Sequence, residues 1–240
     1  MNVFLKVGAP GAREAAARSD VVVVIDALRA SVTITSALVV GAVKVIPVVT
    51  ITEARAYLDQ EGYLVAGERG GVQIEGFHFG NSPTELWRQA AEVRGKTLIL
   101  TTSSGTRCVE AAQEGAGAIL AGALPNATAL AQAAFDLAGE RGRDISLIAA
   151  GFDGQATAED LFAARLIAHR LAGMGAVLAE GECGDRPAES EAIEVLRDSL
   201  SGQKLRGLGY GEDVAFCAQI DIFDAVPIYR DDGFVVQGTG

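Results

Sequence analysis

Short apolar runs alternate with helical segments along most of the chain, and this alternation constrains the fold more than any other feature. The run Val21–Ile25 consists entirely of β-branched residues, and a helical pattern over 30–40 follows it. A continuous apolar run of this kind is typical of a strand buried on both faces. Further strands are expected at 44–49, 63–66, 97–100, near Ile119 and at 144–150. The alternation predicts a three-layer α/β/α fold with a mostly parallel or mixed central sheet.

Capping patterns mark where helices begin between these strands. Thr50 and Glu53 have the spacing of a capping box, and Ser82 precedes a proline at the first helical position. Thr157 and Asp160 repeat the capping spacing ahead of a long helix with one apolar face. Two more helices are expected at 106–114 and 126–138.

The pattern changes near Cys183. A charged helical region over 188–200 is followed by a segment in which Asp-Asp-Gly separates "PIY" from "FVV". This arrangement predicts a C-terminal hairpin. A chain of 240 residues suits one α/β domain over 1–240, or two small lobes that meet near residue 183.

Charge and cysteine usage exclude several classes of protein. The net charge of -11 argues against binding to a nucleic-acid backbone, which needs clustered Lys and Arg. The cysteines Cys108, Cys183 and Cys217 are odd in number and far apart, so neither a disulfide framework nor a zinc site is expected. No apolar run approaches the roughly 20 residues that span a bilayer, and the first residues lack a signal-peptide layout. These features predict a cytoplasmic protein in a reducing compartment, without a membrane or nucleic-acid partner.

Polar residues follow four of the expected strands. In a parallel sheet, ligands bind outside the carboxyl ends of the strands, so these residues are expected at one edge. They are Asp26 and Arg29, then Glu68 and Arg69, then the stretch Thr101–Arg107, and finally Asp153, Glu159 and Asp160.

Each of these residues also has a structural explanation. Asp160 is fully explained as the capping residue three positions after Thr157, and Ser82 is better explained as a cap than as a ligand. The stretch "TTSSGT" alone would be a tight turn. Single arginines are most often surface ion-pair partners that contribute little to stability.

The combination favours an anion site. Hydroxyls and free N–H groups at a helix start bind anions, and Gly105 would permit close approach of the bound oxygens. Arginines add bidentate donors for phosphate, carboxylate or sulfonate. Carboxylates beside a bound anion require a cation between them, and Mg²⁺ is bound by one or two carboxylates together with phosphate oxygens. The pattern therefore indicates a Mg²⁺-assisted site for a small polyanionic phosphate.

Competing motifs are missing from the sequence. It contains no dinucleotide fingerprint, no P-loop and no Gly-x-Ser-x-Gly elbow. The sequence contains only two histidines, His78 and His169, so a histidine-based triad or phosphohistidine mechanism is disfavoured. Phosphatases with an aspartyl nucleophile need a second Asp two residues after the first, where this chain has Leu28, so a covalent aspartyl-phosphate is disfavoured.

Five segments, in order between about residues 21 and 229, resemble the 2-phosphosulfolactate phosphatase (ComB-like) family. They are "VVVVIDALRASVTITSAL", "AGERGGVQIEGFHFGNSP", "LTTSSGTRCVEAA", "AAGFDGQATAEDLFAARLI" and "CAQIDIFDAVPIY". The resemblance implies a three-layer α/β fold and Mg²⁺ dependence. It also implies hydrolysis of 2-phospho-3-sulfolactate, or a similar 2-phospho acid, to 3-sulfolactate and phosphate in coenzyme M biosynthesis. A non-catalytic module that binds small anionic metabolites is the alternative, and a homo-oligomer is plausible.

The resemblance and the strand-end pattern together nominate the site residues. The expected metal ligands are drawn from the carboxylates Asp26, Glu68, Glu159 and Asp160, and the expected catalytic residues are Asp26, Glu68 and Arg107. The expected substrate-binding residues are Arg29, Arg69, Asn81, Ser82, Thr102, Ser103, Ser104, Gly105, Thr106 and Arg107. Asp221 also matches a family position, without an assigned role. The region 183–208 resembles the family only weakly.

Overall fold

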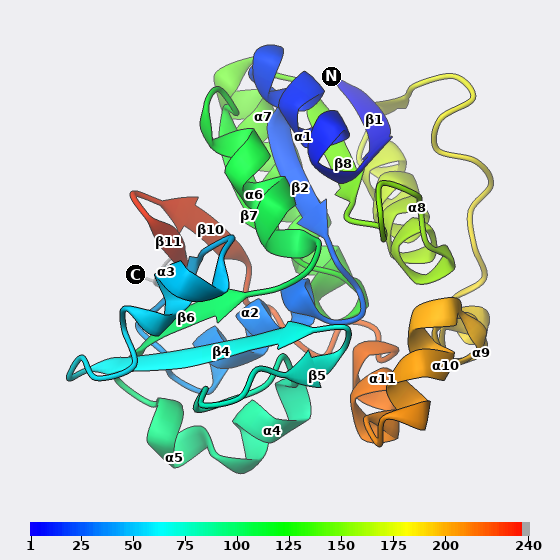
Figure 1. Ribbon diagram of the computed structural model, residues 1–240. Helices are drawn as coiled ribbons and strands as arrows, with labels where there is room; N and C mark the ends of the chain where they lie inside the picture. The colour runs from blue at the N-terminus through cyan, green and yellow to red at the C-terminus, as the bar shows by residue number, and fades with distance from the viewer. Residues whose placement is uncertain (237–240) are drawn as a thin grey trace.

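A mixed β-sheet with helices on both faces forms the centre of the protein in the computed structural model, which describes residues 1–236 (Figure 1). Within those residues the sheet has 11 strands in the order β5-β4-β6-β3-β11-β10-β7-β2-β8-β1-β9. The strands are β1 (Asn2–Val7), β2 (Val21–Ile25), β3 (Lys44–Pro47), β4 (Tyr63–Arg69), β5 (Val72–Gln73), β6 (Thr97–Thr101), β7 (Ala118–Ala121), β8 (Ile145–Ala149), β9 (Val177–Leu178), β10 (Pro227–Arg230) and β11 (Gly233–Val236). This is the three-layer α/β/α fold that the alternating pattern predicts.

The helices vary widely in length. They are α1 (Gly8–Ala17), α2 (Ala30–Val39), α3 (Ile51–Arg55), α4 (Pro83–Arg88), α5 (Ala90–Val93), α6 (Gly105–Gln113), α7 (Ala127–Arg141), α8 (Ala158–Gly173), α9 (Ala192–Asp198), α10 (Leu200–Gly207) and α11 (Gly211–Cys217). Among the described residues, no helix is long and apolar enough to cross a membrane.

The C-terminal hairpin lies in the middle of the sheet. Strands β7, β2, β8, β1 and β9 form one parallel group, and β3, β6 and β4 form another. The antiparallel pair β10–β11 joins them, because Ile228 pairs with Leu120 of β7 and Phe234 pairs with Val45 of β3 (Figure 1). The predicted hairpin is thus confirmed, and the sheet is mixed because of it and because β5 pairs antiparallel with β4.

Strand β2 shows why the fold has three layers. All five of its residues are buried, as expected for a strand covered on both faces. Val21, Val23 and Ile25 share a core with α7 and α8, whereas Val22 and Val24 share another with α1 and α6. Successive side chains of a strand point to opposite faces, so one apolar run supplies both cores.

Most predicted boundaries agree with the structure to within a few residues. Thr50 and Glu53 form the predicted capping box, and Ser82 caps α4 by accepting a bond from the backbone N–H of Glu85. The predicted strand at 63–66 continues to Arg69. The predicted helix at 188–200 is interrupted at Ser199, whose hydroxyl caps α10.

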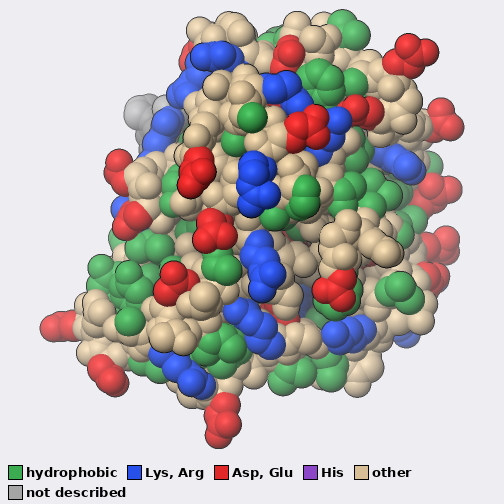
Figure 2. Space-filling view, turned by 45° about the horizontal axis from the view of Figure 1, so that its top comes forward, with side chains coloured by type: hydrophobic (Ala, Val, Ile, Leu, Met, Phe, Trp, Pro, Cys, Tyr) green, Lys and Arg blue, Asp and Glu red, His purple; other side chains and the backbone are tan. Residues whose placement is uncertain are grey.

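The surface carries charges of both signs. Figure 2 shows a face on which Lys and Arg are interspersed with Asp and Glu, with hydrophobic side chains scattered between them. The excess of acidic residues in the composition therefore does not produce a uniformly acidic surface on this face.

Candidate active site

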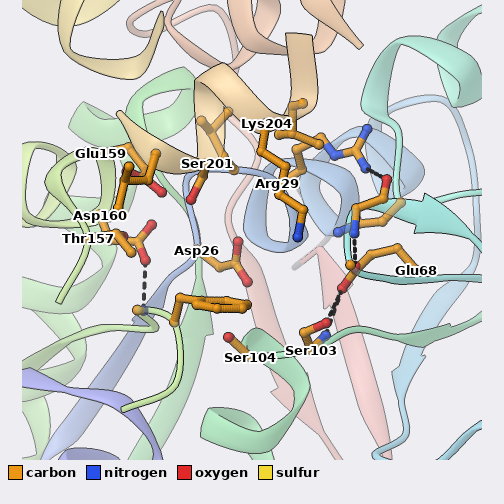
Figure 3. A pocket seen from close by; sticks show the side chains of 18 residues that line it. Asp26, Arg29, Glu68, Ser103, Ser104, Thr157, Glu159, Asp160, Ser201 and Lys204 are labelled. Atoms are coloured by element: carbon orange, nitrogen blue, oxygen red, sulfur yellow. Dashed lines mark hydrogen bonds between the residues drawn. The ribbon is translucent and has the colours of Figure 1, made fainter. Parts of the chain in front are cut away.

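The four polar loops meet around one cavity of about 250 Å³ (Figure 3). The loops after β2, β6 and β8, together with the end of β4, contribute to its walls. These elements belong to both parallel groups of the sheet, so the cavity spans the region that the C-terminal hairpin joins. Helix α10 supplies the wall on the opposite side from Ser103 and Ser104.

Four carboxylates line this cavity, and each residue is at most 8% exposed. They are Asp26, Glu68, Glu159 and Asp160. Burial, together with the negative charges of Glu68 and Glu159, raises the pKa of Asp26 to about 6. Burial, followed by the charges of Asp26 and Glu159, also raises the pKa of Asp160 well above its usual value. Such shifts are common where carboxylates are gathered for binding or catalysis.

Asp160 is not a helix cap, contrary to the capping pattern. Its Oδ1 accepts a 2.7 Å bond from the backbone N–H of Ala27, and its Oδ2 accepts a 2.8 Å bond from that of Gly151. The Thr157 side chain makes no capping bond, and its buried hydroxyl finds no hydrogen-bond partner within residues 1–236. Asp160, in the first turn of α8, therefore connects the loop after β2 to the loop after β8.

The stretch after β6 binds carboxylates of the protein itself. The backbone N–H and the hydroxyl of Ser103 both donate 2.8 Å bonds to Glu68 Oε1. A Cβ atom at Gly105 would lie 2.8 Å from Asp26 Oδ2. In the structure the close approach at Gly105 is toward Asp26, while an approach of the same backbone to a bound anion stays a prediction.

Only part of this stretch faces the cavity. Ser103 and Ser104 line it. Thr102 and Thr106 are buried and bond to each other, with the Thr106 hydroxyl donating to the Thr102 carbonyl at 3.1 Å. Arg107 is exposed on α6 and does not line the cavity. Unlike Asp26 and Glu68, Arg107 is therefore not part of the cavity wall.

Among the three nominated arginines, Arg29 alone lines the cavity. It is 2% exposed, and its guanidinium donates to Asp213 Oδ2 at 2.5 Å and to the Gly71 carbonyl at 3.0 Å. The ring of Tyr210 lies 4.3 Å from the guanidinium carbon. Arg69 instead donates to the Val49 carbonyl and the Thr101 hydroxyl, outside the cavity wall.

The remaining nominated residues divide between the cavity and the scaffold. Asn81 lines the cavity, and its buried Oδ1 has no hydrogen-bond partner among the described residues. Ser82 donates a 2.8 Å bond to Asp213 Oδ1 and caps α4, so it supports the partner of Arg29. Asp221 accepts bonds from Thr128 at the start of α7 and from Arg170, and it does not line the cavity.

Sequence patterns missed the contribution of α10. Leu200, Ser201, Lys204 and Leu205 all line the cavity, although no motif marks them. Their spacing along one helical face is a detectable signal, but it is shared by every amphipathic helix. Phe152 was also missed, although it lies in the loop after β8.

The donor set fits Mg²⁺. Within residues 1–236, no three Asp, Glu, His or Cys side chains lie close enough together to hold a metal ion alone. Mg²⁺ usually needs only one or two carboxylates, because water and substrate oxygens complete its shell. Glu159 Oε2 is a buried oxygen for which residues 1–236 provide no hydrogen-bond partner, and its residue lines the cavity beside three further carboxylates. A cation would also relieve the repulsion that raises the pKa of Asp26.

Fold and cavity together define an α/β protein with an enzyme-like site, in which buried carboxylates and an arginine surround one cavity at the strand ends. Comparison with known proteins gives the particular family. The chain matches the family described as 2-phosphosulpholactate phosphatase over residues 9–232, and it belongs to that family.

Curated relatives cover nearly the same length of chain. The chain is 39% identical over 213 residues to the 2-phosphosulfolactate phosphatase of Methanothermobacter thermautotrophicus. The aligned residues make up 89% of this chain and 88% of that relative. It is 36% identical to a probable 2-phosphosulfolactate phosphatase of Carboxydothermus hydrogenoformans, and the alignment covers 88% of this chain and 87% of the relative. It is 35% identical to a protein of the same description from Thermus thermophilus, with 88% of each chain covered.

Proposed function

We propose that this protein is a Mg²⁺-dependent phosphatase that hydrolyses 2-phospho-3-sulfolactate, or a similar small anionic 2-phospho acid, to the hydroxy acid and phosphate. The observation that carries the proposal is the gathering of four buried carboxylates and Arg29 around one cavity, in a chain of this family. For the sulfonated substrate, the family resemblance points to coenzyme M biosynthesis in the cytoplasm.

Glu159 is the carboxylate best suited to hold Mg²⁺, and Asp26 is expected beside it because burial and the charges of Glu68 and Glu159 raise its pKa, an effect that a cation would offset. Both oxygens of Asp160 accept backbone N–H groups, and both oxygens of Glu68 do the same, from Gly71 and Ser103. Glu159, in contrast, has an oxygen without a hydrogen-bond partner in the described part of the chain. When bound, Mg²⁺ supplies Lewis-acid polarisation of the phosphoryl group and orientation of a water molecule.

The protein's own groups bind and orient the substrate. Asp213 and Gly71 each occupy one N–H of the Arg29 guanidinium, which has five, so three donors are left for an anionic oxygen. Ser103 and Ser104 add polar groups at the start of α6, where the N–H groups of the helix favour negative charge. Glu68 and Asp160 fix the loops that carry these residues, because each accepts backbone N–H bonds from them.

A direct assay tests the proposal. Phosphate release from 2-phospho-3-sulfolactate and from other 2-phospho acids would be measured with Mg²⁺ and again with EDTA. We expect release with Mg²⁺ and loss of release with EDTA. Binding of these acids without any phosphate release under Mg²⁺ would indicate the anion-binding module instead.

A further inference from the structure

The cations that line the cavity differ in how they are used. Within residues 1–236, Arg29 and Lys204 are the Lys and Arg residues of the cavity wall. Arg29 is buried and paired with Asp213. Lys204 is exposed, and in the described part of the chain no carboxylate lies within 4.0 Å of its ammonium group. The cavity thus has one cation that an ion pair holds in place and one cation that has no carboxylate partner within residues 1–236.

Lys204 is directed into the cavity by the helix that carries it. Ser201 and Lys204 are three residues apart, so they lie on the same face of α10, and both line the cavity opposite Ser103 and Ser104 (Figure 3). The Lys204 ammonium lies 5.7 Å from the centre of the Phe152 ring. A Cβ atom at Gly70 would lie 3.8 Å from the same nitrogen. The ammonium is therefore positioned between the turn after β4 and the loop after β8.

Helix α10 is held firmly enough to present this face. The Ser199 hydroxyl caps it by accepting a 3.0 Å bond from the N–H of Gly202, and Leu205 is buried in the core that includes α8 and α11. A lysine in the last turn of a helix gains a little from the helix dipole wherever it points. Arg206 occupies the same turn, is exposed, and does not line the cavity, so the dipole does not account for the direction of Lys204.

We propose that Lys204, assisted by Ser201, determines specificity by binding the sulfonate of the substrate. The inference rests on the proposed function. The phosphoryl group belongs with the carboxylates and their cation, and the planar fork of Arg29 suits the substrate carboxylate. The sulfonate is one carbon further from the phosphoryl group, and its three oxygens suit a compact ammonium and a hydroxyl on the facing wall.

The test compares two substrates that differ only in the sulfonate. The kcat/KM values for 2-phospho-3-sulfolactate and 2-phospholactate would be measured for the wild type, Lys204→Met and the matched control Arg206→Met. We expect Lys204→Met to lower kcat/KM for the sulfonated substrate by roughly 10–100-fold, the effect of losing a hydrogen bond to a charged group. Activity on 2-phospholactate should stay within about twofold, and the control should retain both activities.

Two results would overturn the inference while leaving the phosphatase intact. Equal losses on both substrates would mean that Lys204 contacts a group they share, and no loss on either would mean that it contacts neither. If the wild type hydrolyses neither substrate, the proposed function fails, and the assignment of Lys204 is then tested by the binding of 3-sulfolactate. In that case 3-sulfolactate should raise the melting temperature of the wild type but not of Lys204→Met, and equal shifts, or none, would overturn the assignment.

Discussion

Asp26 shows how a single carboxylate can be unfavourable for folding and necessary for activity. In the metal-free protein, burial raises its pKa from 3.8 to about 6. Between those values the unfolded chain has already released the proton while the folded chain retains it. The free energy of unfolding therefore falls as the pH rises through this window, and the loss is complete above about pH 6.

Asp26→Asn removes this titration. With EDTA present, we expect the free energy of unfolding of the variant, relative to the wild type, to rise by about 2 kcal/mol between pH 4 and pH 7, because one pKa unit corresponds to about 1.4 kcal/mol and part of the shift already acts at pH 4. Turnover with Mg²⁺ should fall at least about a hundredfold, as on removal of a key electrostatic group. Urea denaturation at both pH values and a phosphate-release assay measure these effects. A constant stability difference across the window would contradict the buried, repelled state of Asp26.

Gly105 allows the helix start to approach Asp26. In Gly105→Ala the added Cβ would lie 2.8 Å from Asp26 Oδ2 and 3.0 Å from the Ala30 side chain, so the carboxylate must shift. We expect kcat/KM to fall roughly 10–100-fold, since a displacement of about 1 Å costs this much, while the circular dichroism stays unchanged.

The matched control for this substitution is Gly139→Ala in α7. There the nearest atom to an added Cβ is 3.8 Å away, an ordinary contact. Alanine is the better helix former, so this variant should be active and slightly more stable. Full activity in Gly105→Ala would show that the position of Asp26 is not critical.

At the scale of the elements, two threonines that each precede an acidic residue by three positions differ in whether they cap a helix. Thr50 makes both bonds of a capping box at α3, whereas Thr157 makes none at α8. Thr50→Ala should lower the free energy of unfolding by about 1 kcal/mol, the usual cost of a lost cap. Thr157→Ala should change it by less than about 0.5 kcal/mol, because no capping bond is lost. Urea denaturation of both variants makes the comparison, and equal losses would restore the capping role of Thr157.

These helix starts also show what sequence can and cannot predict. Strands β2, β3, β4, β6, β7 and β8 were predictable because each is an apolar run, and the gathering of Asp26, Glu68 and Glu159 follows from a parallel sheet. The role of Asp160 was not predictable from the sequence. The spacing between Thr157 and Asp160 is the same whether the Asp160 side chain bonds to its own helix or to the backbone of Ala27 and Gly151.

Direction and long-range packing account for the other differences. Arg107 follows the strand as the pattern requires, but the rotation of α6 directs it outward. Lys204 reaches the cavity through the packing of α10 with α9 and α11, which no local pattern encodes. The segment over 1–20 forms β1 and α1, for which the sequence patterns gave no prediction.

For the whole molecule, the C-terminal hairpin connects the two parts of the sheet that form the cavity. Phe234 on β11 is fully buried and packs edge-on against Tyr229 of β10. Phe234→Ala should lower the free energy of unfolding by about 3–5 kcal/mol, the usual cost of truncating a buried aromatic.

The structure also predicts an effect of this substitution on activity. Asp26 follows β2 in one parallel group and Glu68 ends β4 in the other, so a loosened hairpin should disturb their relative position. We expect the variant to lose activity at a lower urea concentration than the wild type, together with its helical signal. A loss of stability below about 1 kcal/mol would mean that the two groups hold together without this contact.

The central place of the hairpin has a consequence for biosynthesis. A ribosome makes a chain from its N-terminus, so the strands at 227–236 emerge after every other strand of the sheet. Until then β3 and β7 present open hydrogen-bonding edges, which readily pair with other chains. A nascent chain stalled before residue 227 would therefore expose the unpaired edges of β3 and β7 and an incomplete cavity. We expect a chaperone that binds unfolded segments to bind the chain at these edges.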